Sequence, residues 1–243
     1  MSAAAMTPLR LVSGGFDGET ISSPCVEALT APRTRPVLLV HGFAGTKSSW
    51  ALVEHNLRLR GLTVEAMSYP PAGTSVAQLA DRLAAEVDRV LSRTGADKVH
   101  LVGHSLGGVL IAQAIADGRL DGRVDAVITL GSPFGGSPWA NLLPVNEIVR
   151  ALRHGSPVLR RLESIPLPDS VRWVSMTAAL DIIVPGLRSV PSHDQVETFR
   201  FDGVGHLGLL LSPQVIGCIA ATLCGHGTTR AAEAPMALLP SAS

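Results

Sequence analysis

The sequence has few of the features that mark several classes of protein. Its 243 residues include three cysteines, Cys25, Cys218 and Cys224, and no Cys-x-x-Cys spacing. Three scattered cysteines are too few for a disulfide framework, and the missing spacing excludes the common cysteine-based zinc and redox motifs. A disulfide between Cys218 and Cys224 would leave Cys25 without a partner.

An excess of charge of one sign is also missing. Lys and Arg together number 20, as do Asp and Glu, so the formal net charge is +0 and no stretch is strongly basic or acidic. Binding to nucleic acid depends on concentrated positive charge that neutralises phosphates. We therefore expect no nucleic-acid partner.

Long apolar runs are absent as well. No uninterrupted apolar stretch approaches the ~18 residues of a membrane span. The first ten residues lack a charged segment followed by a long apolar core, so we identify no signal peptide. These absences predict a cytoplasmic protein, or a secreted one if a leader precedes the printed sequence.

Apolar side chains, in contrast, are abundant, at 46% of residues against 16% charged. This composition and length suit one α/β domain over residues 1–243, with its core over about 36–223. Residues 1–35 read as an irregular lead-in with a short edge strand near residues 10–12. Residues 226–243, rich in Ala, Ser, Pro and Thr, are predicted to form a disordered tail.

One stretch carries the strongest functional signal. An apolar run over 99–102 leads into Gly103-His-Ser-Leu-Gly107, and helical spacing follows over 109–116. This order of strand, Gly-x-Ser-x-Gly turn and helix is the context of a nucleophile elbow. The two glycines permit a turn where side chains would crowd the neighbouring elements. The turn lifts the hydroxyl of Ser105 to the positive end of a helix.

Three other predicted strands end in loops with polar residues, and the first of them is a continuous apolar run of the kind that buried parallel strands produce. Residues 36–40 lead into the sequence His-Gly-Phe. Residues 171–176 lead into a loop that holds Asp181. Residues 196–201 lead into a Gly-Val-Gly-His turn that ends at His206.

Helical spacing elsewhere predicts the layers around the sheet. Apolar residues recur at helical intervals over 76–90, and Ser48 or Ser49 is in place to cap a helix that ends at Gly61. The apolar stretch 209–223 predicts one further helix after the last strand.

Together these motifs resemble the lipases and esterases of the α/β-hydrolase family. The resemblance implies an α/β-hydrolase fold, with a mostly parallel central sheet, helices on both faces and a small lid insertion. It implies a serine carboxylic-ester hydrolase with a triad of Ser105, Asp181 and His206, in the chain order that this fold uses. The reaction would pass through an acyl-enzyme on Ser105, without a metal or another cofactor.

The resemblance also assigns the oxyanion hole to backbone N–H groups. One belongs to Phe43, the residue after His-Gly, and the other to Leu106, the residue after the nucleophile. The side chain of His41 is then expected to orient the loop through a hydrogen bond and to take no part in the chemistry.

The chemistry explains why three residue types are needed. A serine hydroxyl is a poor nucleophile at neutral pH and needs a base within hydrogen-bond reach, here His206. A buried carboxylate must orient the imidazole and stabilise its charged form, here Asp181. Asp194 and Asp202 are the alternative acids. The other histidines lie in the elbow, the His-Gly-Phe loop, helices, a strand, the lid or positions without a strand-end context: His41, His55, His100, His104, His154, His193 and His226.

The pattern changes over residues 137–168, where two amphipathic stripes predict a lid over the site. The alternative is a pair of ordinary crossover helices that bury a core face. The apolar character of this segment and of the loop that precedes it favours an acyl or aromatic substrate, with Phe134 and Trp139 as substrate-binding residues.

The expected partner is a small acyl ester or a lipid, with transient contact to a lipid surface through the lid and no stable protein partner. Two alternatives keep the same fold. An acyltransferase or thioesterase would use the same triad with another acyl acceptor or donor, and a non-catalytic scaffold would use the fold for binding alone.

Overall fold

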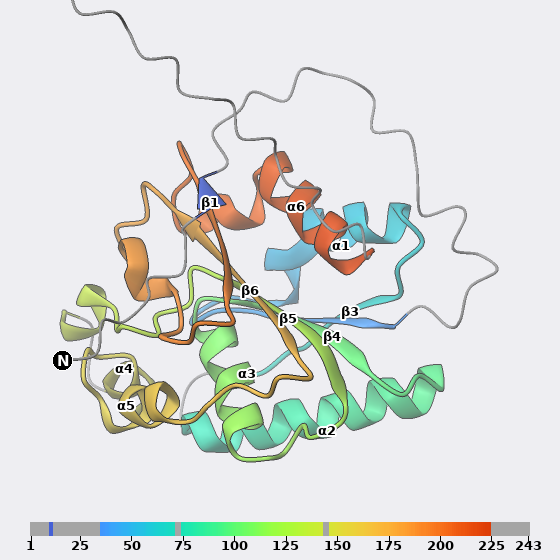
Figure 1. The fold of residues 1–243 in the computed structure, drawn as a ribbon, viewed down its shortest axis with the longest axis horizontal. Helices are drawn as coiled ribbons and strands as arrows, with labels where there is room; N and C mark the ends of the chain where they lie inside the picture. The colour runs from blue at the N-terminus through green and yellow to red at the C-terminus, as the bar shows by residue number, and fades with distance from the viewer. Residues whose placement is uncertain (1–9, 12–34, 71–73, 143–145, 225–243) are drawn as a thin grey trace, which may run out of the picture.

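The computed structural model describes residues 10–11, 35–70, 74–142 and 146–224 (Figure 1). Its centre is a seven-stranded sheet in the order β1-β7-β6-β5-β4-β2-β3, and every neighbouring pair is parallel. The expected α/β fold with a parallel sheet is therefore confirmed. The strands are β1 (Arg10–Leu11), β2 (Val37–Val40), β3 (Val64–Ala66), β4 (Val99–His104), β5 (Val124–Leu130), β6 (Arg172–Ala178) and β7 (Glu197–Phe201).

The strand that carries the elbow lies inside the sheet. β4 pairs with β2 on one side and with β5 on the other, so Gly103 faces Val40 and Thr129 in register. All six residues of β4 and all four of β2 are buried. Because helices cover both faces of these strands, side chains on both faces are buried, which explains why apolar residues predominate in them.

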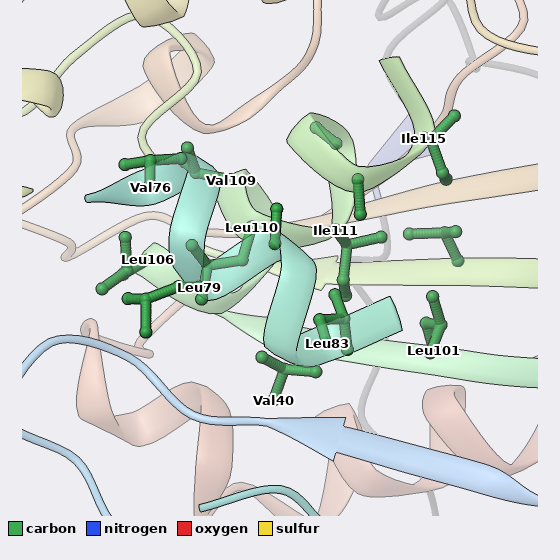
Figure 2. Packing of buried hydrophobic residues seen from close by; sticks show 14 of the residues in the cluster. Val40, Val76, Leu79, Leu83, Leu101, Leu106, Val109, Leu110, Ile111 and Ile115 are labelled. Atoms are coloured by element: carbon green, nitrogen blue, oxygen red, sulfur yellow. The ribbon is translucent and has the colours of Figure 1, made fainter. Parts of the chain in front are cut away.

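Helices cover both faces of the sheet, as expected (Figure 1). On one face lie α1 (Ala51–Leu59) and α6 (Pro213–Leu223), which share an apolar cluster with β3, β6 and β7. The other face carries a second cluster, in which Leu79 and Leu83 of α2 lie close to Leu110 of α3 and Val40 of β2 (Figure 2). The helices on this face are α2 (Val76–Thr94), α3 (Leu106–Ala116), α4 (Glu147–Ala151) and α5 (Pro157–Ser164).

The helix predicted over 76–90 forms and is capped at both ends. The N–H of Gln78 donates to Oγ of Ser75 at 3.1 Å, and Oε1 of Gln78 accepts the N–H of Ser75 at 2.9 Å. This reciprocal pair satisfies two backbone donors at the start of α2. Gly95, with φ 67°, ends the helix in the left-handed conformation that glycine favours.

The predicted start of the helix before Gly61 is wrong. A 3₁₀ turn, η2 (Lys47–Trp50), precedes α1 and is capped by Thr46, whose N–H donates to Oγ of Ser49 at 3.1 Å. Ser49 therefore lies inside the turn and does not begin it.

The stretch 209–223 is not one helix. It divides into a 3₁₀ turn, η5 (Leu207–Leu210), and α6, with Ser212 extended between them. Pro213 lacks an N–H and disfavours helical backbone at the residue before it, which interrupts the helix despite its apolar pattern.

The edge strand expected near residues 10–12 is confirmed for Arg10–Leu11, which pairs with β7. Val12 and the predicted tail over 226–243 lie outside the described residues. Within the described part of the chain, no helix is long and apolar enough to cross a bilayer.

Candidate active site

The elbow after β4 has the strained geometry that its sequence predicts. Ser105 has φ 52° and ψ −120°, a conformation that residues other than glycine rarely adopt, and its N–H donates to the carbonyl of Leu130 at 2.9 Å. A Cβ on Gly103 would lie 2.6 Å from the backbone nitrogen of Gly108, and one on Gly107 would overlap the carbonyl of Val40. The helix and the strand thus approach each other more closely than any side chain would allow.

The His-Gly-Phe loop packs directly against the nucleophile. A Cβ on Gly42 would lie 3.0 Å from Cβ of Ser105, so only glycine fits there without displacing a neighbour. Within the described residues, the N–H groups of Phe43 and Leu106 donate to no acceptor. Leu106 is also the first residue of α3, where the helix dipole favours negative charge. An oxyanion hole needs such free N–H donors beside the nucleophile, and the assignment of Phe43 and Leu106 to it stays a prediction.

Tyr69 and His41 support this loop from behind. The Tyr69 hydroxyl donates a hydrogen bond to the carbonyl of His41, and the two rings stack with centroids 4.0 Å apart. Nδ1 of His41 donates to the carbonyl of Gly42 at 2.9 Å, and burial lowers the pKa of this imidazole. His41 therefore orients the loop as a neutral side chain, as expected.

Asp181 and His206 form a buried pair. Nδ1 of His206 donates to Oδ2 of Asp181 at 2.7 Å, and their side chains are 10% and 1% exposed. The second carboxylate oxygen accepts the N–H groups of Ile183 at 2.9 Å and Val184 at 2.8 Å. Because a carboxylate only accepts here, Nδ1 carries the hydrogen and Nε2 of His206 keeps its lone pair for a proton from another group.

The end of β5 lies beside all three predicted triad residues. Leu130 accepts the N–H of Ser105. Gly131, the next residue, has φ 55°, and a Cβ there would lie 3.1 Å from both Oδ2 of Asp181 and Nδ1 of His206. Gly131 was not singled out from the sequence, because its close contacts come from residues far along the chain.

A second histidine was missed by sequence reasoning. His104, 5% exposed, donates from Nε2 to the backbone carbonyl of His206 at 3.1 Å, and the two ring centroids are 4.7 Å apart. From the sequence, His104 was set aside as a histidine of the elbow, whereas it contacts the predicted base.

The alternative acid Asp202 pairs with a cation. Its carboxylate lies 3.5 Å from Nε of Arg200, and its side chain is exposed, in contrast to Asp181. Within the described residues, no group of three or more His, Cys, Asp or Glu side chains is placed to hold a metal ion.

The two predicted substrate-binding residues lie in different surroundings. Phe134 packs edge-on against Trp173, with centroids 6.2 Å apart, and joins the core. Trp139, 39% exposed, donates from Nε1 to the carbonyl of Ile182 at 3.0 Å, beside the loop that holds Asp181. Contact with substrate stays a prediction for both.

The predicted lid segment over 137–168 contributes to the core. Its apolar stripes are buried together with α2 and α3 through Ile148, Val149, Leu159 and Leu162. The hydroxyl of Ser137 donates to the carbonyl of Ile183 at 2.6 Å, which ties the start of the segment to the acid loop. Burial of the stripes is what the crossover-helix alternative expects, and the lid stays a prediction.

A sequence model of the family described as the alpha/beta hydrolase fold matches residues 35–162, more than half of the chain. This chain belongs to the α/β-hydrolase family. Solved structures of other α/β-hydrolases share its architecture. Mature lipase BlEst2 of Bacillus licheniformis matches with a TM-score of 0.69 at 19% identity, over 79% of this chain and 93% of that one. Lipase B of Aspergillus fumigatus matches with a TM-score of 0.69 at 17% identity, over 78% of this chain and 52% of that one.

Two curated relatives of this α/β-hydrolase are named triacylglycerol lipase. The protein of Burkholderia plantarii is 34% identical over 157 residues, 58% of this chain and 41% of its own length. The protein of Pseudarthrobacter phenanthrenivorans is 34% identical over 121 residues, 44% of this chain and 36% of its own length. The chain therefore matches less than half the length of each.

Proposed function

We propose that this α/β-hydrolase is a serine carboxylic-ester hydrolase of the lipase or esterase type, acting on acyl esters through an acyl-enzyme on Ser105. The observation that carries the proposal is the buried pair of Asp181 and His206, 2.7 Å apart, beside a strained serine at the end of the same sheet. The two triacylglycerol lipases among its relatives support the same reaction class.

Each group has a place in the reaction. His206 takes the proton of the Ser105 hydroxyl on Nε2 while Oγ attacks the ester carbonyl, and Asp181 stabilises the imidazolium. The N–H groups of Phe43 and Leu106 stabilise the oxyanion of the tetrahedral intermediate. His206 then gives the proton to the departing alcohol, which leaves an acyl group on Ser105. Water, deprotonated by the same imidazole, releases the carboxylic acid and restores the enzyme.

The distribution of exposed apolar side chains supports a lipid substrate. Nine large apolar side chains are exposed among the described residues, and seven of them lie in segments that follow β5, β6 and β7. We call these seven the apolar rim: Trp139, Leu142, Leu180, Ile182, Leu187, Leu207 and Leu211. Leu180 and Ile182 flank the acid, and Leu207 follows the base. Exposed apolar side chains in segments that follow the carboxyl ends of these strands suit contact with an apolar ligand or a lipid surface.

The test is a hydrolysis profile over p-nitrophenyl esters of increasing acyl length, with and without dispersed triglyceride. The wild type should hydrolyse these esters, and Ser105→Ala should lower turnover at least about 10⁴-fold. Retention of activity by Ser105→Ala, or no hydrolysis of any ester by the wild type, would refute the proposal. Added alcohol that captured most of the acyl group would assign an acyltransferase instead.

A further inference from the structure

The side chain of His104 lies between the nucleophile strand and the predicted base. It is the last residue of β4, next to Ser105 in the chain and 102 positions before His206. Its ring contacts His206 with centroids 4.7 Å apart, and the ring of Trp50 meets it edge-on at 6.5 Å. The imidazole is thus held on two sides within a buried pocket.

The hydrogen-bond partner fixes the chemical form of His104. The carbonyl of His206 can only accept, so Nε2 of His104 carries the hydrogen in this 3.1 Å contact. Burial, and to a smaller extent the positive charge that His206 can carry, lowers the pKa of His104 to about 3. The ring is therefore a neutral donor throughout the pH range in which esterases are assayed. It is unsuited to act as a general base, since it is protonated only in strong acid.

Hydrogen bonds hold the main chain around His206, and His104 supplies one of them. Gly203 has φ 72° and nothing within 4 Å of where its Cβ would be, and at Gly205 the nearest atom to such a Cβ is 3.5 Å away. At these two positions the turn before His206 has no side chain that packs against a neighbour. The carbonyls of Val204 and Gly205 accept the N–H groups of Leu180 at 2.9 Å and Leu209 at 3.2 Å, and Asp181 holds the ring of His206 through Nδ1. The hydrogen bond from His104 adds a contact at the carbonyl of His206 itself.

We propose that His104 is a positioning residue: its Nε2–H fixes the backbone of His206 and thereby sets the distance between the base and the neighbouring Ser105. One dipeptide, His104-Ser105, then carries both the nucleophile and the donor that locates its base. This inference rests on the proposed function, because it assigns His104 a role in the same triad. Displacement of a reacting group by about 1 Å can lower a rate about 10²-fold, so the contact matters for turnover.

Three substitutions separate the donor from the bulk of the side chain. His104→Gln places an amide N–H the same number of bonds from Cα as Nε2, whereas the amide of His104→Asn is one bond shorter. His104→Leu removes the donor. The control is His100→Leu, which replaces another buried histidine of β4 that lies near Asp125, at 3.7 Å, and away from the site. Ser105→Ala is measured beside them, with kcat and KM on a soluble p-nitrophenyl ester and the Tm of each variant.

We expect His104→Leu and His104→Asn to lower kcat about 10- to 100-fold while KM changes less than about threefold. His104→Gln should keep at least about a third of the kcat, and His100→Leu should keep it within about twofold. If His104→Leu does not fold, the comparison of Gln with Asn decides. A folded His104→Leu with wild-type kcat, or equal losses for Gln and Asn, would overturn the inference. Activity that survives Ser105→Ala would instead overturn the proposed function and this inference with it.

Discussion

Asp181 occupies a position where an unpaired carboxylate would be unstable. Its side chain is 1% exposed, yet both oxygens accept hydrogen bonds, one from His206 and the other from two backbone N–H groups. A buried carboxylate is tolerated only when its charge is satisfied in this way. The two backbone bonds hold Oδ1, which orients Oδ2 toward the imidazole, so the acid holds the base in one tautomer.

The assignment of the acid predicts a large and selective loss of activity. Asp181→Asn should lower kcat about 10⁴-fold, because an amide presents an N–H toward Nδ1 and favours the wrong imidazole tautomer. Asp194→Asn and Asp202→Asn, the two alternatives, should keep kcat within about twofold. Steady-state kinetics on a soluble ester measures all three. A loss for Asp202→Asn as large as for Asp181→Asn would move the acid to Asp202.

At the scale of elements, the site depends on the close packing of the elbow against its neighbours. Gly107→Ala would push a methyl group into the carbonyl of Val40 and should lower the free energy of unfolding by at least about 3 kcal/mol. Gly217→Ala is the matched control, since Gly217 lies within α6 with nothing within 4 Å of the added carbon. It should raise the free energy of unfolding by about 0.5–1 kcal/mol. Urea denaturation of both variants tests this, and equal effects would contradict it.

Elements were predictable where a local pattern dominates. The buried strand β2 follows from a continuous apolar run, and α2 follows from its helical spacing. The break before α6 was missed because the apolar pattern of 209–223 outweighed the effect of Pro213. The cap at Thr46 was missed because three neighbouring hydroxyl residues compete for that role, and tertiary context decides between them.

The candidate site residues could be predicted because each of them follows the end of a strand. Parallel strands place their carboxyl ends along one edge, which is why motifs far apart in the sequence can be expected to meet. The contacts of His104 with His206 and of Gly131 with Asp181 join residues that are distant in the chain. No local pattern encodes such contacts, so only the three-dimensional arrangement reveals them.

For the whole molecule, buried histidines predict acid sensitivity. Burial lowers the pKa of His41 and His100 as well as that of His104. Below about pH 6.5 the unfolded chain binds protons that the folded protein does not, so the free energy of unfolding falls as the pH falls. Each such histidine contributes a slope of up to about 1.4 kcal/mol per pH unit.

The contribution of His104 to this pH dependence can be measured by substitution. His104→Gln should reduce the pH dependence of the free energy of unfolding between pH 6.5 and 5 by about one proton. Urea denaturation at several pH values measures this for the variant and the wild type. Parallel stability curves for the two proteins would show that His104 does not titrate as its burial implies.

The apolar rim predicts a difference between dispersed and soluble substrates. Leu187→Glu should lower the ratio of activity on dispersed triglyceride to activity on a soluble ester about tenfold or more, because a charge opposes contact with the lipid surface. The control is Leu59→Glu, the same change at an exposed leucine of α1, and it should leave the ratio unchanged. Equal ratios for both variants would show that the apolar rim takes no part in binding dispersed substrate.

In the proposed mechanism, Ser105 is a nucleophile that the buried pair of Asp181 and His206 activates. A fluorophosphonate reacts with such a serine, and the modified residue can be located by intact mass and peptide mapping. We expect one adduct, on the peptide that holds Ser105, and none in Ser105→Ala. An unmodified folded protein, or an adduct on any other residue, would contradict it.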